Sequence, residues 1–242
     1  MEFFLISLAQ LVGKEEQLVS KGDKLSAQQD CALVSVPPHF LHRDIVDDWS
    51  ALQQASINAG FDLAVVSAYR SFERQLLIWN EKASGKRAVF DANGQILDVR
   101  KLDDKSLVFA ILRWSALPGG SRHHWGTDID VYDRAAVASD YAVQLVDDEV
   151  NQGGVFEPLH NWLDSRIESA SAQGFYRPYQ GGVSQGIAAE RWHLSHRPTA
   201  EHFRRLLTAE TLYRLLEQET DMRLRDTVLA HFDEIFTRYI AC

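Results

Sequence analysis

The 242-residue sequence contains only two cysteines and no cluster of basic residues. Cys31 and Cys242 lie far apart and one of them is the last residue, so we expect neither a structural disulfide nor a Cys-x-x-Cys zinc knuckle. Lysine and arginine number 25 against 34 aspartates and glutamates, which gives a formal net charge of −9. Because binding to a phosphate backbone depends on clustered cations, nucleic acid is not an expected partner.

No apolar stretch reaches the roughly eighteen residues that a membrane-spanning helix needs. The run FFLISLAQLV at 3–12 has the character of the hydrophobic part of a signal peptide, but Glu2 stands where a basic residue is expected and Lys14 soon follows. We therefore interpret this run as a first core strand or a short helix. This interpretation favours a cytoplasmic location, with export to the periplasm as the alternative.

The rest of the chain alternates between helical and strand patterns. Helical spacing of apolar residues predicts helices over 44–60, 71–85, 104–117 and 156–174. Short β-branched or alternating runs predict strands over 61–68, 128–133 and 188–196, and Asn93-Gly94 predicts the turn of a hairpin over 86–103. Without a regular β-α-β rhythm, this order favours an α+β fold with a mainly antiparallel sheet and flanking helices.

The character of the sequence changes after Pro198. Amphipathic patterns over 199–218 and 221–240 predict two long helices. We therefore expect a main domain over 1–198 and a C-terminal helical extension over 199–242 that packs on the same domain. The extension is also a candidate surface for a homodimer.

The stretch SRHHWGTDID, at 121–130, combines two histidines with two aspartates. In the predicted strand, side chains alternate between faces, so Asp128 and Asp130 share one face while Ile129 enters the core. A histidine and an aspartate at this separation are suitable metal ligands. Taken alone, the same residues can be solvated turn residues and a strand-end hydrogen-bond acceptor.

Two further motifs lie far from this stretch. Glu190 stands three residues before His193, so that its carboxylate could hold a metal-bound water while the imidazole holds the metal. Arg70 ends a predicted strand, where a guanidinium could stabilise the oxyanion formed by attack on an amide carbonyl. The alternatives are a surface glutamate, a half-buried histidine and an ordinary surface arginine.

In their order along the chain, the three motifs resemble the zinc D-alanyl-D-alanine peptidases, the family of vancomycin-resistance carboxypeptidases and dipeptidases. The family is related more distantly to the lysostaphin-type endopeptidases and the hedgehog signalling domain. The resemblance covers about 35–198. The matching residues are Tyr69, Arg70, Ser71, Ser121, His123, Gly126, Asp130, Glu190, Trp192 and His193.

The resemblance implies a role for each matching polar residue. The implied zinc ligands are His123, Asp130 and His193. Glu190 would be the general base and then the acid that protonates the leaving amine, and Arg70 would stabilise the oxyanion. The residues implied in substrate binding are Tyr69, Arg70 and Ser121. His124 is left out because the family spacing from ligand histidine to aspartate selects His123.

The activity that the resemblance implies is zinc-dependent removal of a terminal D-alanine from a peptidoglycan-type peptide. An endopeptidase of the same fold and a non-catalytic zinc-binding recognition module are the alternatives. The sequence departs from the family at Asp128, where a small apolar residue is usual; Asp128 could pair with Arg122 or Arg191, or face a cationic group of the substrate. His196 is either a partner of a ligand or a solvated strand-end histidine, and 176–180 is either a pocket-lining loop or a surface turn.

Overall fold

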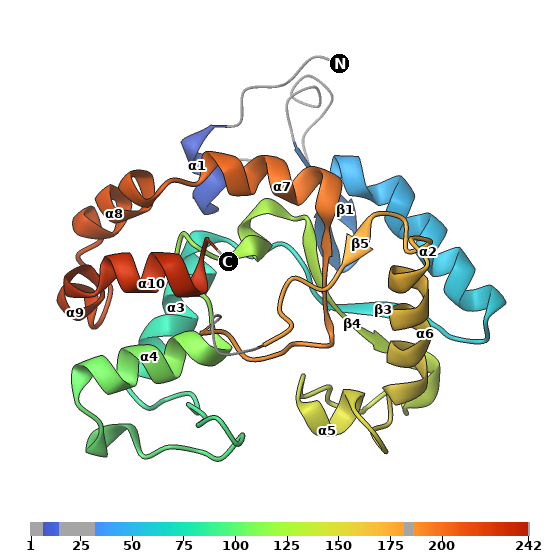
Figure 1. Cartoon of the computed structure of the whole chain (residues 1–242), viewed down its shortest axis with the longest axis horizontal. Coiled ribbons are helices and arrows are strands. Elements are labelled where there is room, and N and C mark those ends of the chain that lie inside the picture. The colour runs from blue at the N-terminus through green and yellow to red at the C-terminus, as the bar shows by residue number, and fades with distance from the viewer. Residues whose placement is uncertain (1–6, 15–31, 182–185, 242) are drawn as a thin grey trace.

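The computed structural model describes residues 7–14, 32–181 and 186–241. Its main sheet is antiparallel, with strand order β3-β4-β6-β5 (Figure 1). The strands are β3 (Leu63–Ser67), β4 (Asp128–Asp133), β5 (Phe175–Tyr176) and β6 (His193–His196). A separate antiparallel pair joins β1 (Leu33–Val36) to β2 (His39–His42). The expected α+β fold with a mainly antiparallel sheet is therefore confirmed.

Two helices cover one face of the main sheet. These are α2 (Val46–Asn58) and α6 (Glu157–Glu168), which lie beside the strands on the right of Figure 1. Apolar side chains of both helices share a buried cluster with Ile129 and Val131 of β4. Because side chains alternate along a strand, Asp128 and Asp130 project from the opposite face of β4. The alternation read from the sequence thus directs two carboxylates away from this core.

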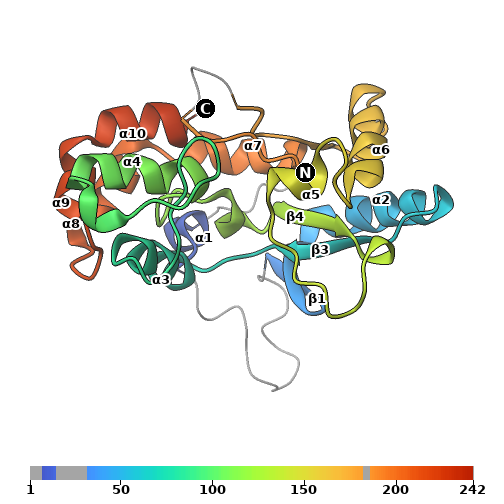
Figure 2. The same cartoon turned by 90° about the horizontal axis from the view of Figure 1, so that it is seen from below.

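Apart from the short helix α5 (Asp147–Val150), which contacts α6, the remaining helices gather on the other side of the molecule (Figures 1 and 2). They are α1 (Leu8–Val12), α3 (Phe72–Ala83), α4 (Asp104–Trp114), α7 (Arg197–Leu206), α8 (Ala209–Gln218), α9 (Arg225–Ala230) and α10 (Phe232–Tyr239). A second buried cluster joins Trp79 of α3 and Ile111 of α4 to residues of every C-terminal helix. The boundary at residue 198 stays a prediction. Among the described residues, no helix has the length and apolar character to span a membrane.

The C-terminal helices are shorter than the sequence pattern predicts. The helix expected over 199–218 breaks after Leu206, because Thr208 accepts a hydrogen bond from the backbone N–H of Thr211 and so begins α8 as an N-cap. The helix expected over 221–240 begins only at Arg225 and breaks at His231, between α9 and α10. The prediction of two long helices was wrong, and in the first of them the N-cap at Thr208 overrides a continuous amphipathic pattern.

Three other boundaries also differ from the expectation. The strand expected over 188–196 is limited to β6, because the N–H of His193 donates to the carbonyl of Glu190 in a tight turn. The hairpin over 86–103 contains a single β-bridge, between Phe90 and Ile96. Helix α6 ends at Glu168, well before 174. Of the first apolar run, 3–6 lies outside the described residues, and 8–12 forms the short helix α1.

Candidate metal centre

Three side chains from separate elements meet at one end of the main sheet. His123 belongs to a 3-10 turn over Arg122–Trp125, Asp130 to β4 and His193 to the start of β6. The antiparallel register pairs Asp130 directly with His193. All three residues are buried, and one donor atom from each lies within 4.8 Å of the others. The structure therefore brings together the three residues that the family resemblance implied as ligands.

The spacing of these donor atoms suits a tetrahedral metal. His123 Nε2 lies 3.3 Å from Asp130 Oδ2, and His193 Nδ1 lies 3.1 Å from Asp130 Oδ1. Zinc ligands lie about 2.0–2.2 Å from the ion, which separates neighbouring tetrahedral ligand atoms by about 3.3 Å. Two imidazoles and one carboxylate supply three donors and leave the fourth position for water or substrate. The donor set thus fits a catalytic type of site.

The His123 ring is oriented by the main chain. Its Nδ1 lies 2.9 Å from the carbonyl oxygen of Ala68, so this nitrogen donates and Nε2 keeps its lone pair toward Asp130. The backbone N–H of Arg70 in turn donates to the carbonyl of His123, at 3.1 Å. Burial lowers the pKa of His123, which favours the neutral, ligating form.

The His193 ring is oriented by side chains. Its Nδ1 faces Asp130, while its Nε2 lies 3.0 Å from Oδ1 of Asp128. Burial opposes protonation, but hydrogen bonds to these two carboxylates outweigh it and raise the pKa of His193 to about 10. Metal binding through Nδ1 must therefore compete with a proton at this nitrogen.

Glu190 lies in the turn that precedes β6. Its Oε2 is 3.5 Å from Nδ1 of His193, and its side chain is 15% exposed. Burial raises the pKa of Glu190 to about 7, although the charges of His193 and Arg70 oppose that effect. A carboxylate that titrates near neutral pH is suited to accept and return a proton during a reaction.

Arg70 is held in the turn between β3 and α3. Its Nη1 donates to Gln75 Oε1 at 2.9 Å and its Nη2 to Ser67 Oγ at 3.0 Å. Burial lowers the pKa of Arg70, while the nearby carboxylates of Asp130 and Glu190 raise it. The guanidinium therefore lies within electrostatic reach of the candidate centre.

Sequence reasoning missed two polar residues of α3. Gln75 is fully buried and connects Arg70 to the carbonyl of Ala116, which its Nε2 reaches at 2.6 Å. Lys82 is 8% exposed, and its positive charge lowers the pKa of Glu190. The two residues are seven apart and share the buried face of the helix with Trp79. Polar residues on an otherwise apolar helix face were the available signal.

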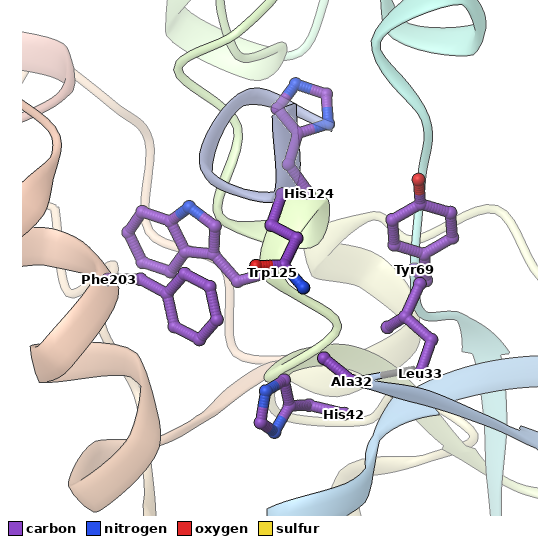
Figure 3. Close-up of a pocket in the computed structure, with 8 residues that line it drawn as sticks. Ala32, Leu33, His42, Tyr69, His124, Trp125 and Phe203 are labelled. Atoms are coloured by element: carbon purple, nitrogen blue, oxygen red, sulfur yellow. The ribbon is translucent and has the colours of Figure 1, made fainter. Parts of the chain in front are cut away.

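Tyr69 and His124 lie in a separate small pocket (Figure 3). Other side chains that line the pocket are His42, Trp125 and Phe203, and none of the three candidate ligands is among the lining residues. His124 accepts a hydrogen bond from the N–H of Gly119 and donates to the carbonyl of Arg70, which agrees with its exclusion as a ligand. The roles of Tyr69 and Ser121 in substrate binding stay predictions.

The comparison with family models decides the assignment. Residues 38–199 match the VanY family, described as D-alanyl-D-alanine carboxypeptidase. The chain belongs to the D-alanyl-D-alanine carboxypeptidase family. The match includes all the candidate ligands, together with Arg70 and Glu190.

The chain is also similar to individual members and relatives. One uncharacterized protein of Haemophilus influenzae is 51% identical over 79 residues, which are 33% of this chain and 54% of the relative. A second uncharacterized protein of the same organism is 30% identical over 125 residues, which are 51% of this chain and 92% of the relative. The chain thus spans about half the length of the first. A solved structure of VanYB in complex with D-Alanine-D-Alanine is 20% identical to this chain, with a TM-score of 0.50. The match covers 81% of this chain and 93% of the VanYB chain. This likeness shows the fold.

Within this family fold, the residues that the sequence left open have definite partners. Asp128 pairs with Arg122, whose Nε lies 2.9 Å from Oδ1, whereas Arg191 pairs with Asp164. His196 is hydrogen-bonded to Asp48 of α2 and Thr199 of α7, so it joins two helices to the end of β6.

The loop over 176–180 lies against the centre. The Tyr179 ring centroid is 4.8 Å from that of His193, and the Tyr176 hydroxyl accepts a hydrogen bond from Arg122. Arg177 instead turns away to Asp164. The pocket-lining interpretation of this loop stays a prediction.

Proposed function

We propose that the protein is a zinc-dependent D-alanyl-D-alanine carboxypeptidase, which releases the terminal D-alanine from a peptidoglycan-type peptide. The observation that carries the proposal is the convergence of His123, Asp130 and His193 beside Glu190, in a chain of this family. Zinc is supported by the chemistry of the donors, since two imidazoles and one carboxylate with an open fourth position are typical of catalytic zinc sites.

The residues around the donors have the properties that amide hydrolysis requires. When bound, zinc would supply a Lewis acid that polarises the scissile carbonyl and makes water more acidic. Glu190 would accept the proton of the attacking water and pass it to the leaving amine, which its pKa of about 7 permits. The Arg70 guanidinium, held by Gln75 and Ser67, would stabilise the negative charge that develops on the carbonyl oxygen.

The charges near Glu190 favour a carboxypeptidase over an endopeptidase. Arg70 and Lys82 both lower the pKa of Glu190, and Arg87 lies close enough to lower the pKa of Lys82. A group of cations in a chain of net charge −9 suits the free terminal carboxylate of a substrate. An endopeptidase substrate carries an amide in the corresponding position. A homodimer through the C-terminal helices and a cytoplasmic location stay predictions.

The test is the release of D-alanine by the zinc-loaded protein. A peptide that ends in D-Ala-D-Ala is incubated with the wild type and with Glu190→Gln, and free D-alanine is measured by chiral chromatography. We expect wild-type release, and a loss on the order of 100-fold or more in the variant because a proton-transfer group is removed. Zinc content, measured by atomic absorption, should be equal in the two proteins.

Glu168→Gln is the matched control, because Glu168 is exposed at the end of α6. It should keep the wild-type rate. Undiminished hydrolysis by zinc-loaded Glu190→Gln would contradict the role of Glu190. Absence of hydrolysis by the wild type on D-Ala-D-Ala, the muramyl pentapeptide and intact wall alike would favour a non-catalytic zinc module. Internal cleavage of the wall alone would favour an endopeptidase.

A further inference from the structure

Asp128 is a buried carboxylate that the proposed reaction does not use. Its exposed fraction is 0%, and it lies two residues before Asp130 on the same face of β4. The register pairs Asp128 with Ser195 and Asp130 with His193, so both carboxylates lie beside β6. A carboxylate without partners is strongly destabilising in a protein interior, so the partners of Asp128 indicate why it is tolerated there.

Asp128 has a charged partner and two further donors. Arg122 Nε donates to Oδ1 at 2.9 Å, and Thr127 Oγ1 donates to Oδ2 at 2.6 Å. His193 Nε2 lies 3.0 Å from Oδ1.

Arg122 is itself fixed by neighbours of the site. Its side chain is 6% exposed, and its Nη2 donates to Ser195 Oγ at 2.6 Å and to the Tyr176 hydroxyl at 3.0 Å. The guanidinium therefore contacts β6 and β5 at once. The ion pair between Arg122 and Asp128 is a buried, charge-assisted contact that lies against Nε2 of His193.

This unit determines which nitrogen of His193 can bind a metal. An ionised carboxylate only accepts hydrogen bonds, so Nε2 must carry the proton that points to Asp128. Nδ1 is then the atom left for a metal, and it faces Asp130 at 3.1 Å. Metal-binding histidines in proteins commonly donate their second nitrogen to an outer acceptor, which fixes the ring and its tautomer.

We propose that Asp128, held by Arg122, is a positioning residue that fixes the tautomer and the plane of the His193 ring for metal binding through Nδ1. The proposal rests on the metal site of the proposed function. It gives a role to Asp128, a buried carboxylate that the proposed reaction does not use.

The first test measures zinc affinity in the full chain by competition with a chromophoric chelator. The variant Asp128→Ala/Arg122→Met removes both buried charges together, so neither is left unpaired. We expect its zinc affinity to fall by about 10–100-fold, as is typical when an outer partner of a ligand is lost. Asp128→Asn keeps an oxygen acceptor for His193 Nε2 and should recover most of the affinity.

The exposed pair Arg134–Asp62 provides the matched control. Asp62→Ala/Arg134→Met should bind zinc as the wild type does. If the buried double variant is folded by circular dichroism and keeps wild-type affinity, the proposal is overturned. If that variant does not fold, the spectrum described next decides the proposal.

The second test reads the tautomer directly. Nitrogen NMR of the zinc-loaded protein with labelled histidine should give His193 a protonated Nε2 and a zinc-shifted Nδ1, and His123 the reverse. A His193 signal with zinc on Nε2 would overturn the proposal even if hydrolysis occurs. Wild-type protein that binds no zinc would instead remove the proposed function, and this proposal with it, before any variant is compared.

Discussion

The two imidazoles of the candidate centre are held in different ways. The second nitrogen of His123 donates to a main-chain carbonyl, that of Ala68, whereas the second nitrogen of His193 lies against the side chain of Asp128. The rings consequently present opposite nitrogens, Nε2 and Nδ1, to the shared carboxylate of Asp130. His123 is thus oriented by the backbone, whereas His193 lies against a carboxylate that forms a buried ion pair with Arg122.

The largest effects should come from substitution of the ligands themselves. The loss of zinc affinity should be similar for His123 and His193. His123→Ala and His193→Ala each remove one of three donors, so both should lose zinc affinity by more than the roughly 10–100-fold expected for an outer partner. Competition with a chelator measures this loss. Ala68→Gly retains the carbonyl and should stay close to the wild type. Tight zinc binding by either histidine variant would mean that the three residues do not form one site.

The next largest effect should be on the free energy of unfolding, and it concerns the ion pair that lies against His193. Arg122→Met leaves Asp128 buried beside His193 without its cation, and breaking a buried ion pair in this way typically costs about 3–5 kcal/mol. Urea unfolding of the metal-free protein measures the change. Adding Asp128→Ala to Arg122→Met should return part of the lost stability, because the unpaired charge is removed. If the double variant is no more stable than Arg122→Met alone, Asp128 is not destabilising as an unpaired buried charge, and this account of the ion pair is contradicted.

The smallest effect concerns Lys82, a buried cation without a comparable partner among the described residues. Burial, reinforced by Arg87, lowers the pKa of Lys82 from 10.5 to about 8. Below pH 8 the amine is charged in both folded and unfolded states, so the full penalty of burying it is present; between pH 8 and 10.5 only the unfolded state holds the proton, so the penalty falls as pH rises.

Lys82→Met should therefore stabilise the fold at pH 7, by at most about 3 kcal/mol, and the gain should shrink between pH 8 and 10.5. Urea unfolding at pH 7, 9 and 10.5 tests both statements. Lys101→Met, at an exposed position, is the control and should show no such trend. A gain that does not change with pH would mean that the lysine is not buried as a cation.

Much of the site could be predicted because its signals are local. Alternation in DIDVYD placed Asp128 and Asp130 on one strand face, and the helix expected from residue 71 forms as α3, where Ser71 accepts from the N–H of Arg74 as the N-cap. His123 and His193, in contrast, were implied as ligands by the family resemblance and not by a local pattern, and the structure brings these two residues to Asp130. Patterns within a few residues depend on backbone geometry, which the sequence encodes directly.

What could not be predicted depends on contacts between distant segments. Asp128 had two candidate arginines, and only the folded chain places Arg122 behind it and Arg191 at Asp164. Glu190 was expected within a strand, but its N–H donates to the carbonyl of Tyr179 and its segment forms a turn. Tertiary hydrogen bonds of this kind override a local strand preference.

The central claim is that one metal ion binds between His123, Asp130 and His193. The most direct measurement is a crystal structure of the zinc-loaded protein, with anomalous diffraction recorded on both sides of the zinc absorption edge. We predict one strong anomalous peak bonded to Nε2 of His123, a carboxylate oxygen of Asp130 and Nδ1 of His193. A zinc peak elsewhere in the molecule, with these three side chains unliganded, would contradict the account.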